Sequence, residues 1–161
     1  MSQRIMYPGR AFRRMSVLRT TIAVIAMTVS FSACNNKQEI LKKKYIAEGM
    51  VLYRSQCQNC HQIDGTGFEK LIPPLTDTLY LRQHRDQLAC FIRYGMTDPV
   101  TIHGQVYDQP MMANDRLTEM EIAEILTYVT NAFGNSQEMF TIGEVRRALA
   151  RCQPNDTTAR H

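Results

Sequence analysis

The chain has 161 residues, enough for one domain with a hydrophobic core and too few for two domains of ordinary size. It carries 19 lysines and arginines against 15 aspartates and glutamates, for a formal net charge of +4. Five of the basic residues and none of the acidic ones fall within residues 1–33, so the remainder has 14 basic and 15 acidic residues. This near-neutral balance gives no ground for predicting nucleic acid as a partner.

Residues 1–33 have the pattern of an export signal. Arginines precede an uncharged run from Thr20 to Ala33, which gives a positive segment followed by an apolar one. A transmembrane helix needs about 20 apolar residues, and this run is shorter, so we predict a signal peptide rather than a membrane span. Translation from Met15 would leave a more compact signal, and that start is the alternative.

The segment Phe31-Ser32-Ala33-Cys34 resembles the lipobox of bacterial lipoproteins, although Phe31 replaces the usual leucine. The resemblance implies a lipoprotein-type signal over residues 1–33, lipidation of Cys34 and a polar tether over residues 34–43. It also implies anchoring to a membrane on the periplasmic side of a bacterial cell envelope. The alternative is cleavage after Ser32, which leaves Cys34 as an ordinary thiol.

Residues 40–56 are predicted to form the first helix of the mature chain. Gly49 interrupts this helix, and a glycine in a helix interior costs about 1 kcal/mol relative to alanine. We therefore expect another backbone to pass close to Gly49, and a helix predicted over residues 119–132 is the candidate. The apolar residues that recur at helical spacing are Leu41, Tyr45, Ile46, Met50 and Tyr53.

The segment Cys57-Gln58-Asn59-Cys60-His61 has the spacing of a c-type haem attachment site. In a helical turn this spacing lets the two thiols form thioether bonds to the two vinyl groups of one porphyrin, with the histidine held against the iron. The alternatives are a zinc site and a thiol–disulfide exchange motif. Zinc would need a second pair of ligands, and Cys90 and Cys152 lack such spacing. Thiol exchange would need a βαβ context, whereas a helix precedes this segment.

The residues that follow are predicted to surround the haem. Residues 64–67 form a turn, and two prolines exclude a helix from the apolar segment 71–75. A second helix is expected over residues 85–94, and residues 100–109 are expected to be irregular or a short hairpin. The side chains expected to line the site are Leu75, Leu88, Phe91, Ile92 and Val106.

Two capping boxes, in each of which a threonine precedes a glutamate by three residues, mark the starts of the last helices. The first of these helices covers residues 119–132, and the second ends near Cys152. The sequence thus predicts a helical extension over residues 136–153 and a disordered tail over residues 154–161. The capping residues are Thr118, Glu121, Thr141 and Glu144.

Residues 44–135 resemble a class I monohaem cytochrome c. Gly49 and Tyr53 precede the first haem cysteine at the spacing of that family. The segment Tyr107-Asp108-Gln109-Pro110-Met111 is similar to the one that delivers its methionine ligand. The resemblance implies an all-α cytochrome c fold, with helices wrapped around one covalently attached haem c. The extension after residue 135 resembles lipoprotein cytochromes of the Bacteroidetes type.

By this resemblance, His61 and Met111 bind the iron from opposite faces, and the Pro73 carbonyl accepts a hydrogen bond from His61. Met112 stands where the family normally has proline, so Met112 is the alternative ligand, as Pro74 is the alternative acceptor. Two further histidines, His84 and His103, are weaker alternatives for the sixth position. The residues implied to hold the haem are Cys57, Cys60, His61, Pro73 and Met111.

With both axial positions filled, no substrate reaches the iron. The resemblance therefore implies an electron carrier, not an enzyme, that exchanges single electrons with respiratory redox proteins. The alternatives are a fixed haem subunit of a larger complex and a haem enzyme with an open sixth position. Cys90 and Cys152 are either two buried thiols or, as the resemblance implies, a disulfide.

Overall fold

The computed structural model describes residues 37–152, so the predicted signal peptide, Cys34 and the tail at residues 154–161 lie outside the described residues. The chain divides into two compact units between residues 41 and 42, and of the first unit only residues 37–41 are described. The following description concerns the second unit. No helix in the described part of the chain is long and apolar enough to cross a membrane.

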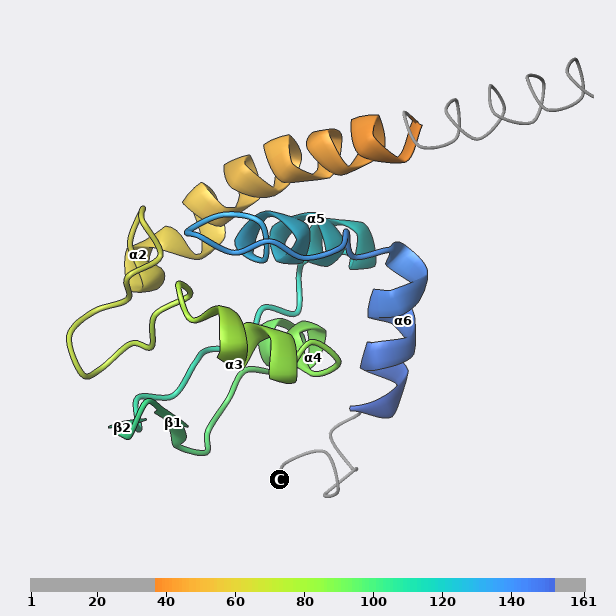
Figure 1. The fold of residues 1–161 in the computed structure, drawn as a ribbon. Helices are drawn as coiled ribbons and strands as arrows, with labels where there is room; N and C mark the ends of the chain where they lie inside the picture. The colour runs from red at the N-terminus through yellow and green to blue at the C-terminus, as the bar shows by residue number, and fades with distance from the viewer. Residues whose placement is uncertain (1–36, 153–161) are drawn as a thin grey trace, which may run out of the picture. The chain divides into compact units, whose positions relative to one another are not determined.

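The first helix runs through residues 37–56, and its part from residue 42 onward lies alongside α5 (Glu119–Val129), as Figure 1 shows. Residues 37–43, which the sequence assigned to the tether, are helical, so the helix begins before the predicted residue 40. Lysine, glutamate and leucine dominate that stretch, and all three favour helix. The predicted close approach at Gly49 is confirmed: a Cβ atom there would overlap the Glu124 carbonyl oxygen and lie 2.8 Å from Cβ of Tyr128.

Three aromatic rings pack where the first helix leaves this crossing. The ring of Tyr53, which is fully buried, lies 5.4 Å from the rings of both Tyr128 and Phe133. Aromatic rings bury a large apolar area and favour tilted contacts at these separations. The cluster therefore fixes the end of the first helix, which the segment Cys57–His61 follows directly.

Three short helices follow, namely α2 (Gln58–His61), α3 (Thr78–Gln83) and α4 (Leu88–Tyr94). The helix predicted over residues 85–94 begins later than expected, and α3 was not predicted. Helix α3 starts after Asp77, whose carboxylate accepts a hydrogen bond of 2.7 Å from the Tyr80 amide. Only Leu81 of α3 is buried, so the helix has no periodic apolar pattern that would reveal it.

The described residues also contain a small antiparallel hairpin of two strands, β1 (Val100–Ile102) and β2 (Gln105–Tyr107). The rest of the fold is all-α. Thr101 pairs with Val106, and both side chains are exposed. The prediction that Val106 lines the site was therefore wrong. Successive residues of a strand point to opposite faces, and here the buried residues are Ile102 and Tyr107.

The C-terminal extension packs into the same core as the helices before it. Both predicted capping boxes are present, and the second opens α6 (Ile142–Arg151). Phe140 and Val145 are almost completely buried within the core cluster that also contains residues of α4 and α5. The Phe140 amide donates a 3.0 Å hydrogen bond to Oγ1 of Thr127.

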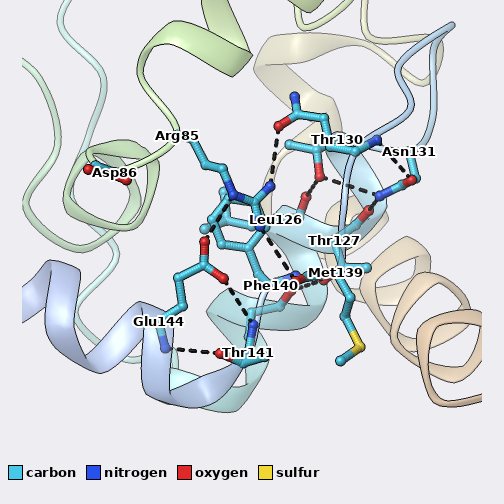
Figure 2. Close-up of polar contacts among 12 residues, drawn as sticks. Arg85, Asp86, Leu126, Thr127, Thr130, Asn131, Met139, Phe140, Thr141 and Glu144 are labelled. Carbon is cyan, nitrogen blue, oxygen red and sulfur yellow. Dashed lines mark hydrogen bonds and ion pairs between the residues drawn. The ribbon is translucent and has the colours of Figure 1, made fainter. Parts of the chain in front are cut away.

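Arg85, which lies between α3 and α4, links that part of the chain to the extension. Its Nε atom lies 2.9 Å from a carboxylate oxygen of Glu144, and its guanidinium carbon lies 3.7 Å from the centre of the Phe140 ring. Figure 2 shows the guanidinium held between these two side chains. An arginine that pairs and stacks in this way fixes one geometry, because its planar group satisfies both contacts together.

The structure also joins Cys90 of α4 to Cys152 at the end of α6 in a disulfide bond. The bond ties the last residue described to α4, the helix that also carries the buried Leu88. The extension is thus connected to α4 both by the core and covalently.

Replacing Cys90 and Cys152 together by serine is expected to lower the free energy of unfolding by about 2–4 kcal/mol, because the bond closes a long loop in the unfolded chain. The two cysteines are 62 residues apart. Guanidinium unfolding of the purified protein measures the change, and wild type treated with a reductant should match the double variant. Equal midpoints for oxidised wild type and the variant would contradict the expectation.

Candidate functional site

An apolar cavity lies between the attachment segment, α3, α4, α5 and the hairpin. It contains about 720 Å³ of unfilled space, a volume that includes open solvent at its mouth. Six of the apolar side chains in its walls are Leu75, Leu81, Leu88, Ile102, Ile125 and Leu126. The cavity suits a large apolar group far better than a polar substrate.

The two attachment cysteines lie within one helical turn, with Cys57 at the N-cap of α2. Cys57 lines the cavity and Cys60 is exposed. The backbone amides of Cys60 and His61 donate to the Cys57 carbonyl at 3.1 and 3.0 Å, which closes the turn. Neither thiol is in a disulfide.

The thiol of Cys57 does not resemble that of an exchange enzyme. Burial, and to a smaller extent the neighbouring Cys60, raise its pKa to about 11. Thiol–disulfide oxidoreductases instead lower the pKa of the attacking cysteine to generate thiolate. Within residues 37–152, no group of three or more histidine, cysteine, aspartate or glutamate side chains could hold a metal ion such as zinc.

His61 lines the cavity and is oriented by a backbone carbonyl. Its Nδ1 atom lies 3.2 Å from the Pro73 oxygen, the acceptor that the resemblance implied. With the proton on Nδ1, His61 donates this hydrogen bond and its Nε2 keeps a free lone pair. Burial lowers the pKa of His61, while the hydrogen bond to Pro73 acts in the opposite direction. The neutral imidazole, which is the form that binds a metal, is therefore favoured.

Gly67 holds the Pro73 carbonyl in place. Its φ is +73°, and a Cβ atom there would lie 2.8 Å from the Pro73 oxygen and overlap the Ile72 carbonyl. The Gly67 amide also donates to the His61 carbonyl at 3.1 Å. The loop thus folds back on the attachment turn, and only glycine fits at this point.

Two further residues support the site, and the sequence reading did not assign them these contacts. The buried hydroxyl of Tyr53 donates a 2.5 Å hydrogen bond to the Gln62 carbonyl, and burial raises the pKa of Tyr53. The buried side chain of Asn135 donates to the carbonyls of Leu75 and Val129 at 2.8 and 3.0 Å. These bonds fasten the loops around the cavity to the helices behind them.

The two candidate methionines differ clearly in position. Met111 lines the cavity, whereas Met112 is 83% exposed. Met111 is held by an isolated antiparallel bridge to Met96, with hydrogen bonds of 3.0 and 2.9 Å. Because successive residues of an extended segment point to opposite sides, only one of the two methionines can face the cavity.

The two other histidines considered as ligands have different partners. His84 stacks on the Tyr80 ring at 4.0 Å and its Nδ1 lies 2.9 Å from the Tyr80 carbonyl. His103, at the tip of the hairpin, pairs with Asp77 and its side chain is 78% exposed. Neither lines the cavity.

The donor set fits a covalently attached haem. The cavity has apolar walls for a porphyrin, the Cys57 thiol, an oriented imidazole and the thioethers of Met96 and Met111, and the exposed thiol of Cys60 lies one helical turn after Cys57. Such a set matches haem ligation by histidine and methionine.

Comparison with known proteins supports the same prosthetic group, a covalently attached haem. A sequence model of the family described as Cytochrome c matches residues 46–133. Cytochrome c-552 of Thermus thermophilus is 29% identical over 114 residues, which cover 65% of this chain and 86% of that protein. For the cytochrome c-552 of a particular strain of the same organism the identity is also 29%, over 76% of that protein. The fructose dehydrogenase cytochrome subunit of Gluconobacter japonicus is 26% identical over 149 residues, which cover 89% of this chain and 30% of that protein.

Replacing Gly67 by alanine is expected to displace the Pro73 carbonyl and free the His61 ring, because the new Cβ atom has no space. Gly104→Ala is the matched control, since Gly104 has a φ of +78° and nothing within 4 Å of the added atom. Both variants suffer backbone strain of roughly 1–3 kcal/mol, and only Gly67→Ala adds a steric clash. Thermal unfolding of the two haem-loaded variants should therefore differ, with Gly67→Ala the less stable; equal melting temperatures would contradict this role.

Proposed function

Because the chain belongs to the cytochrome c family, and so transfers electrons through covalently bound haem c, we propose that His61 and Met111 are the axial ligands of its iron. We propose further that it carries single electrons between respiratory redox proteins. The observation that supports the axial assignment most strongly is that both side chains line the same apolar cavity, whereas Met112, His84 and His103 do not.

The residues around the cavity have separate tasks in this proposal. A haem c bound there supplies an iron that alternates between the ferrous and ferric states. The Pro73 carbonyl fixes the orientation of His61, and the thioether of Met111 is a soft ligand that favours the ferrous state. The apolar walls exclude water and disfavour the extra positive charge of the oxidised state, so burial also favours the reduced form.

Replacing Met111 by alanine is expected to abolish the near-infrared absorption band of the oxidised protein that is characteristic of methionine ligation. The reduction potential should fall as well, because the soft ligand is lost. Met112→Ala removes an equal side chain from an exposed position and should leave the band and the potential unchanged. The opposite result, with the band retained in Met111→Ala and lost in Met112→Ala, would assign the ligand to Met112.

The alternative of a haem enzyme with an open sixth position differs in its response to carbon monoxide. With Met111 bound, the reduced wild type is expected to bind carbon monoxide poorly, and Met111→Ala should bind it readily. Ready binding by the wild type, together with no near-infrared band, would favour the enzyme.

A second candidate function is a fixed haem subunit of a larger oxidoreductase. The similarity to the fructose dehydrogenase cytochrome subunit favours it, as does the helical extension packed onto α4 and α5. Purification in mild detergent distinguishes the two: a shuttle is recovered as a monomer, and a fixed subunit is recovered with partner chains in constant ratio.

The location proposed for this protein is the periplasmic side of a bacterial cell envelope, with Cys34 lipidated. The support is the sequence pattern of residues 1–33, which lie outside the described residues. Membrane attachment would then reside in the lipid, with residues 35 onward projecting from the membrane towards redox partners.

Changing Cys34 to serine is expected to move the haem protein from the membrane fraction to the soluble periplasmic extract, because the lipid is its proposed anchor. Haem absorbance in the two fractions measures the distribution, and Cys90→Ser/Cys152→Ser is the control that keeps Cys34. If the Cys34→Ser protein still sediments with membranes, the anchor lies elsewhere.

A further inference from the structure

The end of α4 and the segment that carries Met111 lie side by side. Besides the two hydrogen bonds between Met96 and Met111, the Asn114 amide donates to the Ile92 carbonyl at 2.9 Å. Gly95 has a φ of +74°, and a Cβ atom there would overlap the Met111 carbonyl and lie 2.9 Å from the Ala113 nitrogen. The two segments therefore touch over their backbones.

Arg93 adds the side-chain part of this contact. Its Nη1 donates to the Asp115 carbonyl and its Nη2 to the Leu117 carbonyl, both at 2.6 Å. A guanidinium is a planar, permanently charged fork, so it can hold two oxygens in one fixed geometry. Hydrogen bonds from a charged donor are also about twice as strong as neutral ones. Arg93 thus holds the far end of the segment whose near end is Met111.

We propose that Arg93 is a positioning residue for the sixth ligand, which it keeps over the iron by holding residues 111–117 against the end of α4. The inference rests on the proposed function, in which Met111 is that ligand. A thioether is a weak, neutral ligand, so how often it occupies the iron depends on how firmly its segment is held. Since α4 also supplies Leu88, Phe91 and Ile92 to the cavity, the same helix lines the site and positions the methionine ligand.

The test uses the haem-loaded protein with Arg93→Met and Arg93→Lys. Arg82→Met is the matched control, because Arg82 is an exposed arginine in the last turn of α3. Each sample is heated while two signals are followed: the near-infrared band, which reports methionine ligation, and far-ultraviolet circular dichroism, which reports the helices. Lysine keeps the charge but cannot hold both carbonyls, and it serves as the second variant if Arg93→Met does not retain haem.

In Arg93→Met the band is expected to disappear about 5–10 °C below its wild-type temperature, before the helices unfold. Arg93→Lys should lie between wild type and Arg93→Met, and Arg82→Met should match wild type. A merely structural arginine would instead shift both signals together.

Two results would overturn the inference and leave the proposed function intact. In the first, the two signals shift together in both Arg93 variants. In the second, Arg93→Met behaves as Arg82→Met does. If the wild type has no near-infrared band, or if Met111→Ala retains it, the axial assignment fails and the inference fails with it. The Met111→Ala spectrum therefore distinguishes failure of the proposed function from failure of the role of Arg93.

Discussion

The contact between Gly49 and the backbone of α5 is the constraint on which the rest of the structure depends. A side chain at Gly49 would overlap the Glu124 carbonyl, so the first helix and α5 can approach this closely only through glycine. The first helix leads directly into Cys57, and α5 supplies Ile125, Leu126 and Val129 to the cavity. The crossing therefore fixes the distance between the haem attachment site and one wall of the haem pocket.

The two proposed axial ligands, which line the same cavity, are held by similar means. His61 is oriented by the Pro73 carbonyl in a loop that a left-handed glycine, Gly67, brings close. Met111 lies in a segment that another left-handed glycine, Gly95, allows against α4. In both cases a glycine lets two backbone segments pack closely, because a side chain there would clash. This close packing gives the loops the rigidity that a redox site requires. Rigid ligands reduce the structural change on electron transfer, and the oxidised and reduced states can then share one geometry.

The features predicted correctly from the sequence depend on residues near one another in the chain. The attachment turn and the two capping boxes each have local signatures, and the structure contains all of them. The helix α3 was missed because one buried leucine in six residues carries no periodic signal. Val106 was misplaced because a shift of one residue in a strand exchanges its two faces. The contacts of Arg85, Arg93 and Asn135 join residues distant in sequence, and no local pattern specifies such partners.

The central claim is that the iron lies between an imidazole and a thioether of this chain. X-ray absorption at the iron edge of the purified protein tests it most directly, because sulfur and nitrogen neighbours scatter differently. We predict one sulfur neighbour beside the nitrogen neighbours in both oxidation states, and its loss in Met111→Ala. An iron shell without sulfur in the wild type would contradict the account.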